Sequence, residues 1–541
     1  MPIFDPYRYA YPSRRNVVYA GRGMAASTSP IASQVGLDTM KAGGNAMDAA
    51  VAMAAVLPLT EPTSNGLGSD CFALVWSAQE GKLFGLNASG VAPVALSAEA
   101  VRQAGYDAVP LEGWLPVMVP GAPKGWGELR RRFGTKSMAE LMAPAIEYAR
   151  EGFPIPVNVS RQWSIEAERI GAAARREPEL FRGWMDCFSR DGRAYCAGER
   201  FRSPDFAETL ESLAASDCES YYRGELMEKL VDFSQKTGGF FQKSDFTGYE
   251  AQWVEPISIR YHGFDVLEMP PNGHGITALM ALNILKELDL GEHRETALAY
   301  HRMIEATKLA FVDAKKFVAD PRYMRTKVED MLSDRYAAAR RSLISDRALL
   351  PEAGDPSCGG TVYFCTADGQ GNMVSMIQSN YNCFGSGIVV PGTGISLQDR
   401  GANFSLDPES DNYLEGGKRS YHTIIPGFLA KDGRPVGPFG VMGGFMQPQG
   451  HIQVIVNTVN YHMNPQEALD APRFQWVGER RVQLEREVPA HVAQGLAEMG
   501  HQVEIVNSNL DMGRGQIIWR TGEGALAGGT EPRADGSLAA W

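Results

Sequence analysis

The spacing of hydrophobic positions predicts that the first two thirds of the chain are rich in helices. In residues 295–318, apolar side chains recur at intervals of three and four, which is typical of one face of a helix. The positions are Met303, Ala306, Ala310, Ala314 and Phe317. Residues 115–155 show similar spacing. We therefore expect layers of packed helices before residue 350.

End signals predict two further helices in residues 25–60. Ser29 precedes Pro30, a combination that starts helices, and Gly43-Gly44 ends the first of the two. Asn45 can cap the second helix, which we expect to stop at Pro58 because proline lacks the backbone donor. A glycine-rich turn at 62–70 then leads into an apolar strand at 71–77.

The pattern changes after "GDPSCGG" at 354–360, which has the composition of a flexible linker. Beyond it, runs of apolar and β-branched residues predict strands. These runs are 361–367, 373–378, 423–430, 451–459 and 480–487. Because helices and strands do not alternate in a repeating βα pattern, we expect a layered α/β fold and not a barrel.

Charge and cysteine content narrow the class of protein. The formal net charge of −12 argues against nucleic acid as a partner, since no basic face is indicated. The seven cysteines form no Cys-x-x-Cys pair, which favours reduced thiols in the cytoplasm over a disulfide framework. The first twenty residues lack the apolar core of a secretory signal, and the longest apolar stretch, "MDAAVAMAAVLPL", is too short to span a bilayer. We expect a soluble cytoplasmic protein without a membrane partner.

Thr361, directly after Gly359-Gly360, is the position with the most specific chemistry. An internal threonine hydroxyl is a weak nucleophile, but at a free N-terminus its own α-amine can accept the hydroxyl proton. That amine has a pKa of about 7.7–8.0, close to the working pH of a general base. A glycine before the threonine removes the Cβ that would hinder attack on the preceding carbonyl. The motif also occurs in ordinary strands, so a structural threonine stays an alternative on spacing alone.

The surrounding sequence resembles the γ-glutamyltranspeptidase family of N-terminal nucleophile hydrolases. The likeness covers nearly the whole chain and includes "VPGAPKGWGELRRRFG", "EATKLAFVDAKKFVADP", "TVYFCTADGQGNMVSMIQSNYNCFGSGI", "GVMGGFMQPQGHIQ" and "NPQEALDAPRFQW". The resemblance implies a four-layer αββα sandwich that cuts itself between Gly360 and Thr361. The products would be a large subunit, 1–360, and a small subunit, 361–541, which together form one αββα unit. A heterodimer of these two products is expected, with a dimer of such heterodimers left open.

The resemblance also implies roles for individual residues. Thr361 would be the nucleophile and its amine the general base. Gly443 and Gly444 match the glycine pair whose backbone N–H groups hold the oxyanion in the family. Ser379, on the strand after the nucleophile, is expected to line the substrate site.

The residues that recognise a glutamyl group in the family are largely replaced here. Ser89 or Val91 stands where an arginine is expected, and Asn403 stands where an acidic residue is expected. The further replacements are Val362, Tyr381, Arg400, His422 and Thr423. Losing an acid and gaining Arg400 suits a pocket for an anion, because a guanidinium pairs with a carboxylate through two hydrogen bonds. Alternatively, Arg400 pairs with Asp399 or another acid and only holds its loop, and His422 is structural.

These replacements predict an amide substrate whose carboxylate lies close to the scissile carbonyl. Oxamate, hydrolysed to oxalate and ammonia, is the preferred example among family activities. A γ-glutamyl hydrolase or transpeptidase acting on glutathione-like compounds and a glutaryl-type cephalosporin acylase stay open. A non-catalytic scaffold is the alternative from another class. No metal site or cofactor is expected, since there is no His-Glu-x-x-His string.

Overall fold

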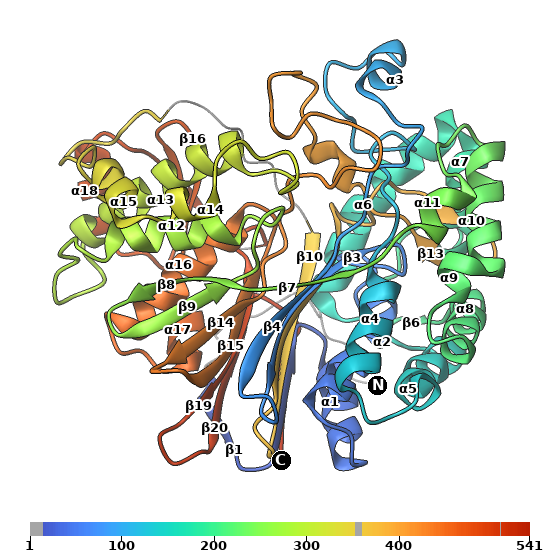
Figure 1. Ribbon diagram of the computed structural model, residues 1–541, viewed down its shortest axis with the longest axis horizontal. Helices are drawn as coiled ribbons and strands as arrows, with labels where there is room; N and C mark the ends of the chain where they lie inside the picture. The colour runs from blue at the N-terminus through green and yellow to red at the C-terminus, as the bar shows by residue number, and fades with distance from the viewer. Residues whose placement is uncertain (1–14, 352–359, 509) are drawn as a thin grey trace.

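Two antiparallel sheets packed face to face form the centre of the molecule. The computed structural model describes residues 15–351, 360–508 and 510–541. Each central sheet has seven strands, and helices cover both outer faces, as Figure 1 shows. The fold is therefore the expected four-layer αββα sandwich. Most of the linker at 354–360, including Cys358 and Gly359, lies outside the described residues.

Both sheets contain strands from before and from after Thr361. The first sheet has the order β21-β2-β10-β11-β3-β4-β7. Its strands are β2 (Gly23–Ser27), β3 (Asp70–Ser77), β4 (Lys82–Ala88), β7 (Gln252–Val254), β10 (Gly360–Asp368), β11 (Met373–Tyr381) and β21 (Ser537–Ala540). Thr361 is the second residue of β10, which lies between β2 and β11.

The second sheet has the order β1-β20-β19-β15-β14-β9-β8. Its strands are β1 (Val18–Ala20), β8 (Ile257–Tyr261), β9 (Phe264–Glu268), β14 (Gly427–Lys431), β15 (Arg434–Met442), β19 (Arg514–Arg520) and β20 (Leu526–Thr530). Strand β15 ends directly before Gly443 and Gly444.

Helices from both parts of the chain form the outer layers. Beside the first sheet, on the right in Figure 1, lie α1 (Pro30–Lys41), α2 (Ala46–Thr60), α4 (Ala122–Phe133) and α5 (Met138–Glu151). Beyond them are α6 (Val157–Arg176), α7 (Pro178–Phe188), α8 (Pro204–Ala215), α9 (Ser220–Arg223), α10 (Glu225–Lys236) and α11 (Lys243–Thr247). Beside the second sheet, on the left, lie α12 (Gly275–Leu285), α13 (Ala297–Phe317), α14 (Val328–Met331), α15 (Asp334–Arg341), α16 (Met446–Val459), α17 (Pro465–Asp470) and α18 (Ala490–Glu498).

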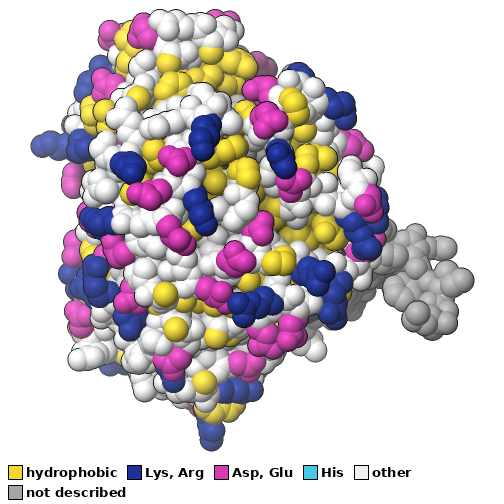
Figure 2. Space-filling view, turned by 90° about the vertical axis from the view of Figure 1, so that its right-hand side faces the viewer, with side chains coloured by type: hydrophobic (Ala, Val, Ile, Leu, Met, Phe, Trp, Pro, Cys, Tyr) yellow, Lys and Arg dark blue, Asp and Glu magenta, His cyan; other side chains and the backbone are white. Residues whose placement is uncertain are grey.

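Short elements complete the structure. They are α3 (Ala98–Gln103), β5 (Phe153–Pro154), β6 (Arg200–Phe201), β12 (Val389–Val390), β13 (Ile395–Ser396), a 3-10 turn at Arg400–Asn403, β16 (Phe474–Gly478), β17 (Arg481–Glu485) and β18 (Gln502–Val506). On the face shown in Figure 2, basic and acidic side chains of the described residues are interspersed, and no broad area of one sign covers it.

The core between the sheets brings β10 against β15. In this core, Phe72 and Tyr363 of the first sheet pack with three residues of the second sheet, Phe428, Met442 and Ile518. The approach is close, because a Cβ on Gly440 would lie 2.4 Å from the Tyr363 ring. The start of β10 and the end of β15 are thereby held beside each other.

Three of the elements predicted from the sequence differ from those in the structure. Helix α2 continues past Pro58 to Thr60, and the Ala54 carbonyl that Pro58 cannot bond instead accepts from Gln378 Nε2 at 3.0 Å. Residues 451–459 belong to α16 and not to a strand. That segment is buried on nearly all sides, so its apolar run carries no periodicity that separates helix from strand. Of 423–430, only the part from Gly427 is in a strand.

Candidate active site

The hydroxyl of Thr361 is buried and held by side chains from two other elements. Thr361 Oγ1 lies 3.0 Å from Ser379 Oγ on β11, and Gln447 Nε2 donates to it at 3.3 Å. The other end of the Gln447 amide, Oε1, accepts from the Ile425 backbone N–H at 3.0 Å. Gln447 is therefore fixed in the orientation that points its NH₂ group at the threonine.

Gly360 precedes Thr361 in the continuous chain and pairs with Tyr381 across the sheet. The register shifts between Gly360 and Val362, so the backbone is irregular at the bond that would be cut. The start of β10 therefore lies opposite Tyr381, which follows Ser379 by two residues on β11.

Gly443 and Gly444 form the turn from β15 into α16. Their φ angles are +132° and +55°, backbone conformations that favour glycine. A Cβ on Gly443 would also lie 3.2 Å from the Cα of Gly513. The turn stands at the N-terminal end of α16, where the helix dipole and exposed N–H groups attract negative charge. Gln447, in the first turn of that helix, links it to Thr361.

Arg400 lies buried beside the same hydroxyl groups, with 1% of its surface exposed. Its Nη1 donates to Thr423 Oγ1 at 2.5 Å, and its Nη2 donates to Ser379 Oγ at 3.3 Å. The guanidinium carbon stands 4.5 Å from the centre of the Tyr381 ring, a cation–π contact. Ser379 thus lies between the guanidinium and the Thr361 hydroxyl.

Asp70, and not Asp399, is the carboxyl that faces Arg400. Asp70 Oδ2 is 3.8 Å from Arg400 Nε, whereas the oxygens of Asp399 accept from the backbone and side chain of Asn382 at 3.0 and 2.8 Å. Burial raises the pKa of Asp70 to about 7, and the Arg400 charge opposes this. Burial also disfavours the charged form of Arg400 and lowers the pKa of its guanidinium, and the nearby Asp70 opposes this shift.

His422 contacts Asp70 and is held in its neutral form. Its Nε2 donates to Asp70 Oδ2 at 2.8 Å, and its Nδ1 accepts from the Ile424 backbone N–H at 3.3 Å. Burial is the main cause that keeps the pKa of His422 well below its usual range, and the positive charge of Arg400 adds to this effect. His422 therefore orients the carboxylate that balances Arg400 and adds no charge.

Most of the residues expected at the site lie together, with one exception. Thr361, Ser379, Tyr381, Arg400 and Thr423 form one contact network, His422 joins it through Asp70, and the glycine pair joins it through Gln447.

Asn403 is the exception, and two residues were missed. The backbone carbonyl of Asn403 accepts from Asn412 Nδ2 at 2.6 Å, and the side-chain Nδ2 of Asn403 is buried without a hydrogen-bond partner among the described residues. Asp70 and Gln447 were not identified from the sequence. Asp70 closes the glycine-rich turn before a buried strand, and Gln447 follows the glycine pair by three residues. An acid at the start of an apolar strand was the signal available for Asp70.

A cavity of about 680 Å³ adjoins the glycine turn. Met442 and Gly443 line it from one side, and Asn382, the residue after Tyr381, lines it from another. The remaining wall comes from α6, from residues 106–112 and from residues 510–514. The cavity therefore lies beside the groups that surround Thr361.

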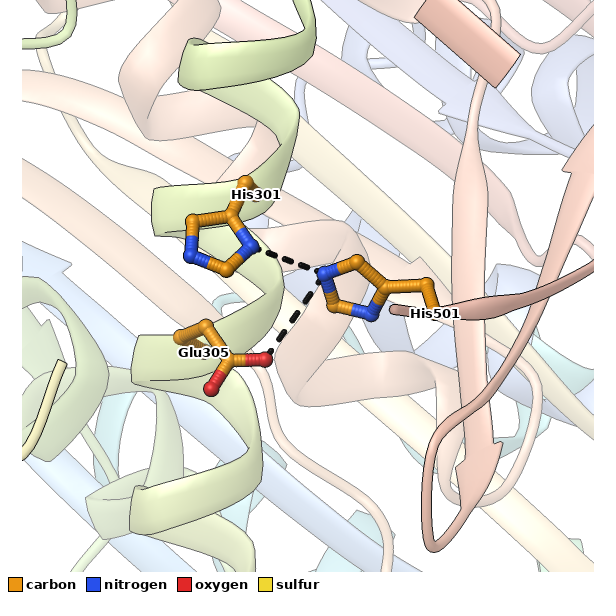
Figure 3. Close-up of side chains that lie close together, drawn as sticks. All are labelled: His301, Glu305 and His501. Atoms are coloured by element: carbon orange, nitrogen blue, oxygen red, sulfur yellow. Dashed lines mark hydrogen bonds and ion pairs between the residues drawn. The ribbon is translucent and has the colours of Figure 1, made fainter. Parts of the chain in front are cut away.

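A second cluster, His301, Glu305 and His501, has the donor types of a metal site (Figure 3). Their ligand atoms lie within 4.8 Å of one another. His301 Nε2 donates to the Ser345 carbonyl at 2.7 Å, so its Nδ1 accepts from His501 Nε2 at 2.8 Å.

Lys308 already neutralises this cluster. Its Nζ donates to Glu305 Oε1 at 2.7 Å and lies 3.5 Å from His501 Nδ1. A divalent cation would add charge beside a buried ammonium group, so the residues fit a hydrogen-bond network better than a metal. Because Glu305 Oε2 also accepts from the Leu349 backbone N–H at 2.9 Å, the network ties the segment before the linker to α13.

The sandwich fold, with a threonine near the start of a central strand and a glycine turn beside it, defines the class of N-terminal nucleophile hydrolases. Residues 32–541 match the gamma-glutamyltranspeptidase family. The chain belongs to this family and is an amidohydrolase of the N-terminal threonine type. Among the described residues, none of the helices is both long and apolar enough to cross a membrane.

The chain aligns over nearly its whole length with relatives that carry different enzyme names. The glutathione hydrolase-like YwrD proenzyme of Bacillus subtilis is 34% identical, covering 96% of this chain and 98% of the relative. The oxamate amidohydrolase proenzyme of Klebsiella pneumoniae is 32% identical, with 96% and 98% covered. A crystal structure of cephalosporin acylase from Bacillus halodurans is 54% identical, with a TM-score of 0.96 over 100% of this chain and 99% of that chain.

Proposed function

We propose that this chain is a self-processing amidohydrolase that cuts itself between Gly360 and Thr361. The mature enzyme would be a heterodimer of residues 1–360 and 361–541 and would hydrolyse the amide of a short carboxylate-bearing acid. Oxamate is the smallest such substrate, with oxalate and ammonia as products. The observation that carries the proposal is the position of Arg400, separated from the Thr361 hydroxyl by the single hydroxyl of Ser379.

Self-cleavage follows from the groups around the threonine. Thr361 Oγ1 attacks the Gly360 carbonyl, and the peptide bond is replaced by an ester as the threonine nitrogen takes up a proton. This step already frees the Thr361 amine. Water then hydrolyses the ester, which releases the Gly360 carboxylate and restores the Thr361 hydroxyl. Ser379 and Gln447 keep the hydroxyl in place for this attack.

Substrate hydrolysis would reuse the same hydroxyl. The free amine of Thr361 accepts the hydroxyl proton as Oγ1 attacks the substrate carbonyl, and the N–H groups of Gly443 and Gly444 stabilise the oxyanion. The protonated amine gives its proton to the leaving nitrogen. Water then releases the acid from the ester and restores the threonine.

Arg400 favours a short acid over a long one. In an oxamyl group the carboxylate is bonded directly to the carbonyl carbon, so it would lie beside Ser379 and within reach of the guanidinium. A glutaryl group places three methylenes between the two carbons. Its carboxylate would have to pass the buried guanidinium and its contacts with Tyr381 and Thr423.

Two other activities stay open for specific reasons. The cavity of about 680 Å³ beside Gly443 and the 54% identity to a cephalosporin acylase favour an acylase that releases a bulky amine. The likeness to a glutathione hydrolase-like proenzyme keeps a γ-glutamyl substrate open. A scaffold without activity would leave the buried Arg400–Asp70 pair without a use at this position.

An amide panel tests the proposal. We expect kcat/KM to be higher for oxamate and its N-substituted derivatives than for glutaryl amides, and lowest for γ-glutamyl anilides. Faster turnover of the γ-glutamyl anilides would refute the assignment. The free cysteines among the described residues favour a reducing compartment such as the cytoplasm, and a dimer of heterodimers stays an expectation.

A further inference from the structure

The cavity beside Gly443 has walls suited to an apolar group. Tyr106, Leu111 and Ile165 line it, and their exposed fractions are 47%, 45% and 58%. Large apolar side chains exposed in one hollow are typical of ligand sites. Ammonia, the leaving group of oxamate, would use none of this surface.

The cavity also contains a cation that lacks a close acidic partner. Two arginines line it, and Arg169 is paired with Glu112 and Glu166 at 2.9 and 2.7 Å. Arg514 is 6% exposed and forms no ion pair within 4.0 Å among the described residues.

The hydrogen bonds of Arg514 are also incomplete. Its Nη1 donates to Gln162 Oε1 at 3.4 Å, and its Nε is buried without a hydrogen-bond partner in the described part of the chain. A buried guanidinium with unused donors is costly unless a ligand pairs with it.

Other charged groups near Arg514 do not replace a ligand. Burial raises the pKa of the Glu61 and Asp535 carboxyls, and the charge of Arg514 opposes this in each. The pKa of Glu61 is raised to about 7. Asp535 already accepts hydrogen bonds from Asn158. Asp511, which also lines the cavity, is exposed to water.

The strand register places Arg514 beside the reacting groups. Arg514 pairs with Met442 across β15 and β19, and Met442 directly precedes Gly443. The residue before it, Gly513, closely approaches Gly443, with 3.2 Å from its Cα to an added Cβ. A group leaving from the carbonyl held at this turn would therefore enter the cavity near Arg514.

We propose that this cavity binds the amine half of the substrate, and that this half is an apolar, ring-sized group that carries its own carboxylate, paired with Arg514. The inference rests on the proposed function, in which Arg400 binds the acyl half. The substrate is then a dianionic N-substituted amide, with one carboxylate on each side of the scissile bond. Oxamate itself would be a minimal substrate that leaves the cavity empty.

Matched anilides test the inference. We would measure kcat/KM for N-(4-carboxyphenyl)oxamate and N-phenyloxamate with the wild type, Arg514→Gln and Arg486→Gln, whose arginine is exposed on the surface. The wild type should prefer the carboxylated anilide by about ten- to a hundredfold, as expected for a charge-assisted pair. Arg514→Gln should bring this ratio close to one, and the Arg486→Gln control should keep the wild-type ratio.

Calorimetry separates failure of the inference from failure of the proposed function. The amine product 4-aminobenzoate should bind wild-type protein at least tenfold more tightly than aniline does, and Arg514→Gln should remove the difference. If oxamyl anilides are hydrolysed but the ratio is near one in the wild type, the inference is wrong and the function stands. If 4-aminobenzoate binds through Arg514 but no oxamyl amide is cleaved, the acyl assignment is wrong and the cavity site stands.

Discussion

Arg400→Lys should lower kcat/KM for oxamate by about ten- to a hundredfold. Lysine keeps the positive charge but has no planar fork, so it cannot donate two parallel hydrogen bonds to one carboxylate. Losing one hydrogen bond to a charged group costs about 1.5–3 kcal/mol, and each 1.4 kcal/mol is a factor of ten in rate. Steady-state release of ammonia from oxamate measures the effect.

Folding must be separated from binding in this test. Arg400→Ala removes the cation whose charge acts most strongly on the buried Asp70, which is expected to cost about 3–5 kcal/mol of stability. The paired substitution Arg400→Met with Asp70→Asn removes both charges together. It should unfold at a higher temperature than Arg400→Ala and still fail to turn over oxamate.

The reasoning would be refuted by normal kinetics. If Arg400→Lys and the paired variant are folded, self-cleave, and keep wild-type kcat/KM for oxamate, Arg400 does not bind the substrate carboxylate. Its contacts with Ser379, Thr423 and Tyr381 would then only hold the 3-10 turn in place.

Three further predictions concern other parts of the molecule. Gly443→Ala should reduce kcat by about a hundredfold or more, because a Cβ at φ +132° would strain the turn that carries the proposed oxyanion donors. Gln447→Leu should slow self-cleavage by about tenfold on denaturing gels, since it removes a donor to the Thr361 hydroxyl. Stability should fall between pH 6.5 and 3 by up to about 1.4 kcal/mol per unit, because burial lowers the pKa of His501 to about 3 and the unfolded chain takes up the proton first.

Each of these three predictions has a result that would contradict it. A Gly443→Ala enzyme with wild-type kcat would remove the glycine turn from the mechanism. Unchanged cleavage rates in Gln447→Leu would mean that Ser379 alone positions the hydroxyl. His501→Phe should flatten the acid side of the stability profile in denaturant titrations, and an unaltered profile would assign the loss to other groups.

Local signals predicted the helix starts because capping is a local interaction. Ser29 and Asn45 accept hydrogen bonds from backbone N–H groups within three residues, as their side chains indicated. The end of α2, by contrast, depends on a distant contact. Gln378, far along the chain, satisfies the carbonyl that lets α2 continue past Pro58.

The candidate site could be predicted only in part for the same reason. Thr361, Gly443 and Gly444 stand in recognisable sequence contexts. Asp70 reaches Arg400 only because β3 and the 3-10 turn meet in the folded chain, at a distance of 330 positions that no local pattern records. Asn403 matched a position in the family sequence pattern, yet in this chain its side chain makes no contact with the Arg400 network among those described.

The intact mass of the purified protein, measured beside a Thr361→Ala variant, tests the central claim most directly. The account predicts two fragments in the wild type, residues 1–360 and 361–541, and one uncut chain in the variant. A single full-length chain in both would contradict it, because Thr361 would then never acquire the free amine on which the proposed chemistry depends.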